Sequence, residues 1–138
     1  MQTNANITLY NIVTIKDVRT VYRTEIYGVN RQGKTKSSAG ENGLNTAKET
    51  RVFIPFTSID QTGKEYLEPV AFRSEGNRGN YITFNEGDIV VRGICPYDLQ
   101  NGSVKELMAQ YDNVLTVLNV DKLDNGSYRM QHFELGVG

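Results

Sequence analysis

β-Branched and aromatic residues are grouped along this chain in short runs, and most of these runs end at Gly, Asn, Asp or Pro. Such runs predict β-strands, because branched and aromatic side chains fit a pleated sheet and the residues between them favour turns. The runs that predict strands are residues 7–15, 18–29, 51–56, 66–72, 81–84, 89–94, 114–123 and 127–135. Consecutive strands joined by tight turns favour a mainly β fold, a small antiparallel β-barrel or sandwich.

Turn residues and prolines indicate how the predicted strands are joined. Asp124, Asn125 and Gly126 separate the last two runs and predict a short hairpin. Pro55 and Pro69 stand inside two other runs. They favour edge strands or bulges there, because proline donates no hydrogen bond to a neighbouring strand.

One short helix is predicted at about residues 103–112. Ser103 and Glu106 form the pattern S-x-x-E, which caps the free N–H groups at a helix start. Apolar residues then recur at helical spacing, at Val104, Leu107, Met108 and Tyr111. Together with the strongest strands, this stripe predicts one shared core that contains Val90, Leu107, Val117 and Phe133.

Residues 30–50, NRQGKTKSSAGENGLNTAKET, interrupt the strand pattern. They are rich in Gly, Asn, Ser, Thr and Lys, and Leu44 is their one sizeable apolar residue. This composition predicts a long polar loop, mobile in the isolated protein because little in it can be buried. Loops of this length in compact domains are often functional.

The start of this segment matches a phosphate-binding motif. GVNRQGKT, residues 28–35, fits the P-loop pattern G-x-x-x-x-G-K-[ST]. A working P-loop needs an amphipathic helix directly after it, and here KSSAGENG follows Thr35, where Gly40 and Gly43 disfavour a helix. We therefore expect no nucleotide binding, and a nucleotide-binding protein remains the third alternative.

Composition limits the remaining possibilities. The chain has 138 residues and a formal net charge of −1, which predicts a single domain spanning residues 1–138 and no general attraction to nucleic acid. Its one cysteine, Cys95, cannot form an internal disulfide. No run of residues has the pattern of a signal peptide or a membrane span, so we expect the protein in a reducing cytoplasm, without a membrane partner.

The chain offers little for catalysis. His132 is the only histidine, and no nucleophile or orienting carboxylate is evident beside it, so a structural role is expected. Asp88 follows Gly87, and a side-chain bond within that turn explains it. The sequence thus predicts a protein that is not an enzyme and holds no cofactor or metal ion.

A second function remains open, that of a small OB-like barrel that binds single-stranded nucleic acid. Such barrels stack bases on aromatic side chains along a basic groove. The residues that would form this surface are Arg19, Tyr22, Arg23, Tyr27, Lys34 and Lys36. In this reading they must lie together on one face.

Several segments resemble a family of small prophage-encoded proteins. In the first half these are ANITLYN, IYGVN and ENGL, and in the second half GDIVVRGIC, VKELMAQYD and LTVLNVDKLDNGSYRMQHFELGV. The order of a Gly-Asp strand, a short helix and a final hairpin is similar to minor capsid and head–tail joining (neck) proteins of tailed phages. In that pattern Trp often follows the histidine, whereas Phe133 stands here.

The resemblance implies a non-enzymatic β-barrel subunit that assembles in a ring at the neck of the virion, as a head–tail connector, head-closure or minor capsid protein. Its implied partners are other copies of itself and the phage portal and tail proteins, with nucleic acid only passing through the channel. It would be cytoplasmic during assembly and part of the virion when mature. The long loop would then contact a neighbour, through Arg31, Lys34, Lys36, Glu41, Asn42, Leu44 and Lys48.

Overall fold

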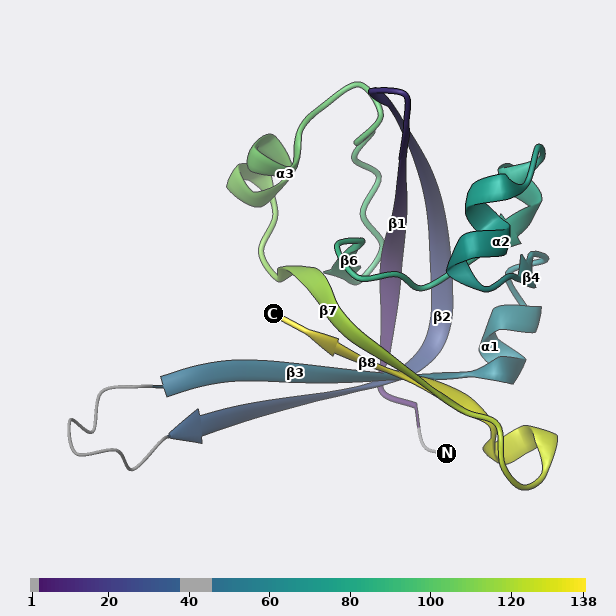
Figure 1. Ribbon diagram of the computed structural model, residues 1–138. Coiled ribbons are helices and arrows are strands. Elements are labelled where there is room, and N and C mark those ends of the chain that lie inside the picture. Colours follow the sequence, from purple (N-terminus) through teal and green to yellow (C-terminus); the bar gives the residue numbers. More distant parts are fainter. Residues whose placement is uncertain (1–2, 38–45) are drawn as a thin grey trace.

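A closed six-stranded antiparallel barrel forms the centre of the molecule (Figure 1). The computed structural model describes residues 3–37 and 46–138. The barrel order is β1-β2-β3-β8-β7-β6, and its strands are β1 (Ala5–Ile15), β2 (Val18–Ser37), β3 (Thr46–Pro55), β6 (Ile89–Arg92), β7 (Val114–Leu123) and β8 (His132–Val137). The predicted mainly β fold is confirmed, as a barrel.

Short elements cover one side of the barrel. They are α1 (Phe56–Asp60), a small parallel pair of β4 (Glu65–Tyr66) and β5 (Tyr81–Ile82), α2 (Pro69–Ser74) and a 3₁₀ turn, η1 (Arg78–Asn80). The strand predicted at 66–72 is therefore wrong, because β4 ends at Tyr66 and a helix begins at Pro69. A proline at the first helical position has no N–H that needs a partner, and its fixed φ suits the helix.

The predicted helix is confirmed as α3 (Val104–Gln110). The Oγ of Ser103 accepts a hydrogen bond of 3.1 Å from the N–H of Glu106, as the S-x-x-E pattern predicts. In a capping box the glutamate side chain also accepts from the N–H of the serine. Here the Ser103 N–H donates instead to the Tyr97 hydroxyl (3.2 Å), and that hydroxyl donates to the Glu106 carboxylate (2.9 Å). Tyr97 thus links the cap to the segment before the helix.

Two hydrophobic clusters replace the single core that the sequence predicts. Val90, Val117 and Phe133 lie in the barrel interior, whereas Leu107 lies in a second cluster with Tyr10, Ile89, Val91, Cys95 and Leu99. Successive residues of a strand point to opposite faces, so β6 contributes Val90 to the interior and its two neighbours to the outer cluster. Helix α3 therefore packs on the outside of β1 and β6.

The long loop predicted at 30–50 is mostly strand. β2 continues to Ser37 and β3 begins at Thr46, with an antiparallel register from Asn30↔Phe53 to Ser37↔Thr46. Residues 38–45, and with them Glu41, Asn42 and Leu44, lie outside the described residues. β1 pairs with β2 only as far as Val29, and β8 pairs with β3 only from Thr50 onwards. The ribbon formed by 32–37 and 46–49, here called the arm, projects beyond the barrel (Figure 1).

The predicted final hairpin is confirmed in its strands but not in its short turn. β7 and β8 pair antiparallel, from Val117↔Val137 to Leu123↔His132. The connection runs over 124–131 and contains a 3₁₀ turn, η2 (Tyr128–Met130), where a strand was predicted. This turn lies on the side of the molecule away from the arm (Figure 1).

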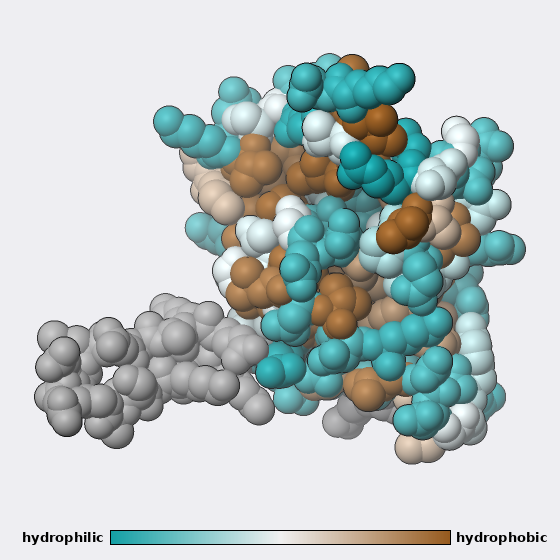
Figure 2. All heavy atoms as spheres, viewed as in Figure 1, coloured by the Kyte–Doolittle hydropathy of each residue, from teal (hydrophilic) through white to brown (hydrophobic). Residues whose placement is uncertain are grey.

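Large exposed apolar side chains are scattered over the surface. They include Val18, Val70, Met108, Leu118 and Met130, which come from five different parts of the fold. On the face drawn in Figure 2, hydrophobic residues emerge among hydrophilic ones in several separate places.

Candidate functional site

On the β1 side, the base of the arm is held by the side chain of Asn4, which makes the hydrogen bonds that a neighbouring strand would otherwise make. Asn4 precedes β1, and its side-chain amide donates to the carbonyl oxygen of Arg31 (3.2 Å) and accepts from the Arg31 N–H (2.9 Å). These two bonds reproduce the pair that a neighbouring strand would make. The β1-facing edge of β2 is thus hydrogen-bonded as far as Arg31, and from Gln32 onwards it has no partner strand among the described residues.

A glycine bulge sets the direction in which β2 leaves the barrel. Gly28 has a φ of +79° at the point where the β1–β2 register shifts between Ala5 and Asn6. Its N–H donates to the Asn6 side-chain oxygen (3.2 Å), and its carbonyl oxygen accepts from the Ser58 hydroxyl of α1 (2.7 Å). Only glycine adopts this φ without strain, so the bend depends on this residue.

The β3 side of the arm base carries a salt bridge. The Arg51 guanidinium lies 2.6 Å from the Glu134 carboxylate of β8, and both side chains are half-buried. Arg31 is also half-buried, and burial lowers the pKa of its guanidinium, with a further contribution from the charge of Arg92. The arm therefore begins from a base whose side chains are fixed on both edges.

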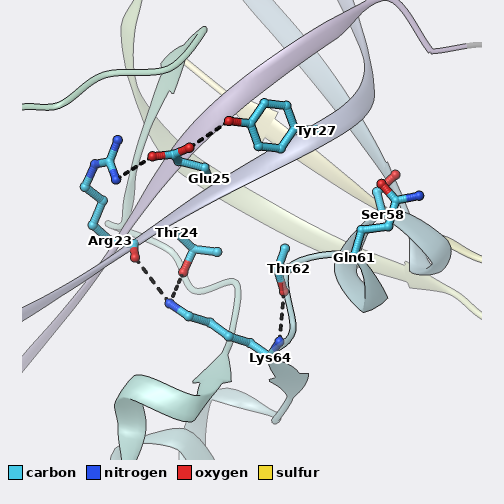
Figure 3. A pocket seen from close by; sticks show the side chains of 8 residues that line it. All are labelled: Arg23, Thr24, Glu25, Tyr27, Ser58, Gln61, Thr62 and Lys64. Atoms are coloured by element: carbon cyan, nitrogen blue, oxygen red, sulfur yellow. Dashed lines mark hydrogen bonds and ion pairs between the residues drawn. The ribbon is translucent and has the colours of Figure 1, made fainter.

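A polar cleft lies beside this base, between β2 and α1 (Figure 3). Its volume is about 300 Å³, and it is lined by Arg23, Thr24, Glu25, Tyr27, Ser58, Gln61, Thr62 and Lys64. The Lys64 ammonium donates to the Thr24 hydroxyl (2.7 Å) and the Arg23 carbonyl oxygen (3.2 Å). Burial lowers the pKa of Lys64, and the positive charge of Arg23 lowers it further.

The remaining charges of the cleft are paired with one another. The Glu25 carboxylate accepts from the Tyr27 hydroxyl (2.7 Å) and lies 2.8 Å from the Arg23 guanidinium, and these two contacts lower the pKa of Glu25. The Ser58 hydroxyl donates to the Gly28 carbonyl oxygen. The charged groups of the cleft are thus bonded to one another or to neighbouring oxygens.

Comparison with known proteins places the chain in a family. The model of DUF6751, a family of unknown function, matches residues 2–138. The chain belongs to this family. Searches of curated proteins and of solved structures gave no match.

The motif GVNRQGKT has a different structural setting in this DUF6751 chain from that of a P-loop. Gly28 forms the bulge of β2, and Gly33 pairs with Thr50 of β3. Residues 28–35 thus lie inside one continuous strand, which runs on to Ser37. A P-loop instead leaves its strand and leads directly into a helix N-terminus, where the phosphates bind.

The six residues of the nucleic-acid alternative are not brought onto one face. Arg19 and Arg23 lie on one face of β2, where they donate to backbone oxygens of Leu99 and Gly102 and of Cys95 respectively. Tyr22 lies on the other face, edge-on to Phe72. The two arginines thus hold the 95–102 connection against the barrel.

The other members of that set lie along the same strand but apart from these contacts. Tyr27 is half exposed beside the cleft, where its hydroxyl donates to Glu25. Lys34 and Lys36 belong to the arm, where their backbones pair with Glu49 and Ala47, and Lys48 lies opposite Thr35. The arm candidates Arg31, Lys34, Lys36 and Lys48 are therefore brought together by the ribbon, as neighbouring positions of two paired strands.

Asp88, for which the sequence predicts a bond within its own turn, is buried and has further contacts. Its carboxylate accepts from the Asn85 N–H (3.2 Å), which confirms the bond within the turn. It also accepts from the side chain of Asn11 (2.9 Å) and the N–H of Ile12 (3.1 Å), so it ties the turn to β1. Burial raises the pKa of Asp88 to about 6, although all three bonds oppose the rise. The distant contacts had no signal in the sequence.

His132, the only histidine, has a local contact. One ring nitrogen lies 2.9 Å from the Met130 carbonyl oxygen, and the ring is 5.8 Å from that of Phe53. Over residues 3–37 and 46–138, no three His, Cys, Asp or Glu side chains lie close enough to hold a metal ion. No helix in the same ranges is long and apolar enough to cross a membrane.

Proposed function

We propose that this protein is a non-enzymatic phage or prophage structural protein that assembles in a ring at the neck of the virion, as a head–tail connector, head-closure or minor capsid subunit. The observation that supports this proposal is the arm, a two-stranded ribbon that leaves the barrel and has no third strand beside it among the described residues. The sequence resemblance to neck proteins agrees with it.

The arm is suited to contact a neighbour through its backbone. Beyond Arg31 the outer edge of β2 has no described partner, and the same is true of β3 before Thr50. An unpaired strand edge is a template on which another chain can add a strand. Natural proteins usually cover such edges, so an edge left open over this length is consistent with a partner that covers it in the assembly.

The fixed base of the arm gives the contact a direction. The Asn4–Arg31 bonds, the Gly28 bulge and the Arg51–Glu134 salt bridge all act where the ribbon leaves the barrel. A ring closes only if each subunit meets the next at the same angle, and otherwise the copies form an open filament. A rigid base therefore serves ring closure better than a flexible tether.

The partners and location follow from this role. Besides other copies of itself, the protein would contact the portal and tail proteins, and nucleic acid would only pass through the channel. It would be cytoplasmic during assembly and part of the virion neck when mature. Free subunits can be monomeric, because a portal template raises the local concentration of weakly binding copies.

The experiment is to shorten the arm in the parent phage. Gly33 and Thr50 are cross-strand partners, so residues 34–49 can be replaced by Asn-Gly, a turn that joins paired strands. The control replaces only residues 38–45 in the same way, between the partners Ser37 and Thr46. The shortened protein should fold but leave heads and tails unjoined, while the control should keep both strands of the arm and allow joining. Normal titres with the shortened arm, or absence of the protein from purified virions, would overturn the proposal.

A further inference from the structure

A second open strand edge lies on the barrel itself, along β7. β6 pairs with β7 only over Val114–Thr116, so from Leu118 to Leu123 β7 has a neighbour on one side, β8. Thr116 exchanges backbone hydrogen bonds of 3.0 Å with Gly138, and Asn119 lies opposite Gly136 after the bulge. Because backbone groups alternate in direction along a strand, those of Val120 and Lys122 face the open side.

Aromatic rings line a groove beside this open edge. The buried Phe133 forms its floor, with ring centroids 4.5 Å from Tyr66, 4.8 Å from the buried Phe84 and 5.1 Å from Phe56, and of these four rings Tyr66 and Phe56 are partly exposed. Two cavities of about 240 Å³ each open here, and both are lined by Tyr66, Lys122 and Phe133. The groove thus runs between β7 and the segments around β4, on either side of the Lys122 side chain.

The Lys122 side chain shows which chemistry the groove accepts. Its ammonium lies 5.6 Å over the ring of Tyr66 and 3.4 Å from the Glu68 carboxylate. Both Lys122 and Glu68 are exposed, and an ion pair of this kind contributes little to stability, so an incoming group can displace the lysine. An aromatic face next to a carboxylate is a binding place for a cation.

Acidic side chains dominate the rim of the groove. The residues that line its two cavities include Asp60, Glu65, Glu68 and Glu86, against Lys64 and Lys122. The segment of the arm and its flanks, residues 30–50, has the opposite balance. It contains Arg31, Lys34, Lys36 and Lys48 but only Glu41 and Glu49, although the whole chain has a net charge of −1. The charge balance of this segment is therefore opposite to that of the rim.

We propose that the β7 edge and this groove receive the arm of a second copy, which adds to β7 as a further strand and brings its basic segment against the Tyr66 ring and the acidic rim. The arm lies on the opposite side of the molecule from β4 and the C-terminal end of β7, which border the groove (Figure 1), so the contact is head to tail. Head-to-tail contacts generate rings when the rotation closes. This inference rests on the proposed function and names the surface with which the arm pairs.

Cross-linking between two marked copies tests the contact. One preparation carries Thr35→Cys in the arm, a second carries Glu68→Cys at the exposed rim of the groove, and a size tag distinguishes the two. The native Cys95 is buried and does not interfere. Mild oxidation of a concentrated mixture should give the mixed dimer several times more often than the same arm copy mixed with Asp112→Cys, which places the thiol at an exposed position just after α3. Equal yields with both partners would overturn the inference.

Two further variants separate the failure of this inference from the failure of the proposed function. The double variant Glu65→Lys/Glu86→Lys, made in the copy that carries Glu68→Cys, reverses the charge of the rim without removing an aromatic ring. It should abolish the mixed dimer, whereas Asp112→Lys in the same copy should not. If the double variant still cross-links and still joins heads to tails in the parent phage, the groove is not the receiving surface. If the shortened arm nonetheless blocks joining, the assembly role stands without the groove.

Discussion

Replacing Asp88 by asparagine measures how burial of one carboxylate makes stability depend on pH. The residue is 2% exposed, and burial raises the pKa of its carboxyl group from 3.8 to about 6. The folded protein therefore holds the proton more tightly than the unfolded chain does. The resulting stabilisation is complete below about pH 4 and is lost as the pH rises through the folded pKa. A shift of about two units corresponds to roughly 3 kcal/mol.

Urea unfolding at about pH 4 and about pH 7 provides the assay. The amide of Asp88→Asn does not titrate. Its NH₂ group faces two other donors, the N–H of Asn85 and the side-chain NH₂ of Asn11. This mismatch destabilises the folded protein by about 1–3 kcal/mol, equally at both pH values. The free energy of unfolding of the wild type, relative to the variant, should fall by about 2 kcal/mol between the two pH values. Glu86→Gln removes an exposed carboxylate from the same turn and should leave that fall in place. Parallel pH profiles for wild type and Asp88→Asn would refute the reasoning.

Three other results are expected. Leu107→Ala should lower the melting temperature measurably, because truncating this fully buried side chain typically costs about 2–5 kcal/mol, and a shift within error would mean that α3 is not packed on β1 and β6. Gly28→Ala should lower the urea midpoint by forcing a positive φ, at roughly 1–2 kcal/mol, and by bringing a Cβ to 3.3 Å from the Ser58 hydroxyl oxygen; an unchanged midpoint would show that the bulge tolerates a side chain. Calorimetry with ATP or GTP and Mg²⁺ should show no binding, whereas a micromolar affinity abolished by Lys34→Ala would contradict the strand setting of GVNRQGKT.

The barrel strands with apolar side chains could be predicted because a strand that packs on a core has apolar residues at alternate positions. β1, β3 and β6 each place alternate residues in a buried cluster, and the Ser103 cap marks the start of α3 directly. The sequence of the arm has no such alternation. A ribbon with no core to cover needs no apolar face, so its polar residues resemble those of a loop. Its strand character depends on the β2–β3 pairing, which is not local.

Other predictions were wrong because one residue type fits more than one structural context. Pro69 fits an edge strand and a helix start equally well, and only the packing of Phe72 against Tyr22 shows that α2 forms there. Leu107 and Val90 both look like core residues, but alternation along β6 separates them into two clusters. The groove at β7 combines residues of β4, β7 and β8 with Phe84 of the segment after β5, so no local pattern indicates it.

The strength of the proposed contact predicts how the protein behaves in solution. Val120 and Lys122 offer two N–H and two C=O groups to an incoming arm, each worth about 0.5–1.5 kcal/mol net. Association of two free copies costs on the order of 4–15 kcal/mol in lost freedom, so backbone pairing and a few exposed charges cannot hold a dilute dimer. In a ring on a template each contact becomes intramolecular, with an effective concentration on the order of millimolar. Sedimentation at micromolar concentration should therefore show a monomer, and added salt should reduce the cross-linking yield because the charged part of the contact is exposed. A stable ring in the absence of a template would mean that the interface buries far more than the β7 edge and its groove.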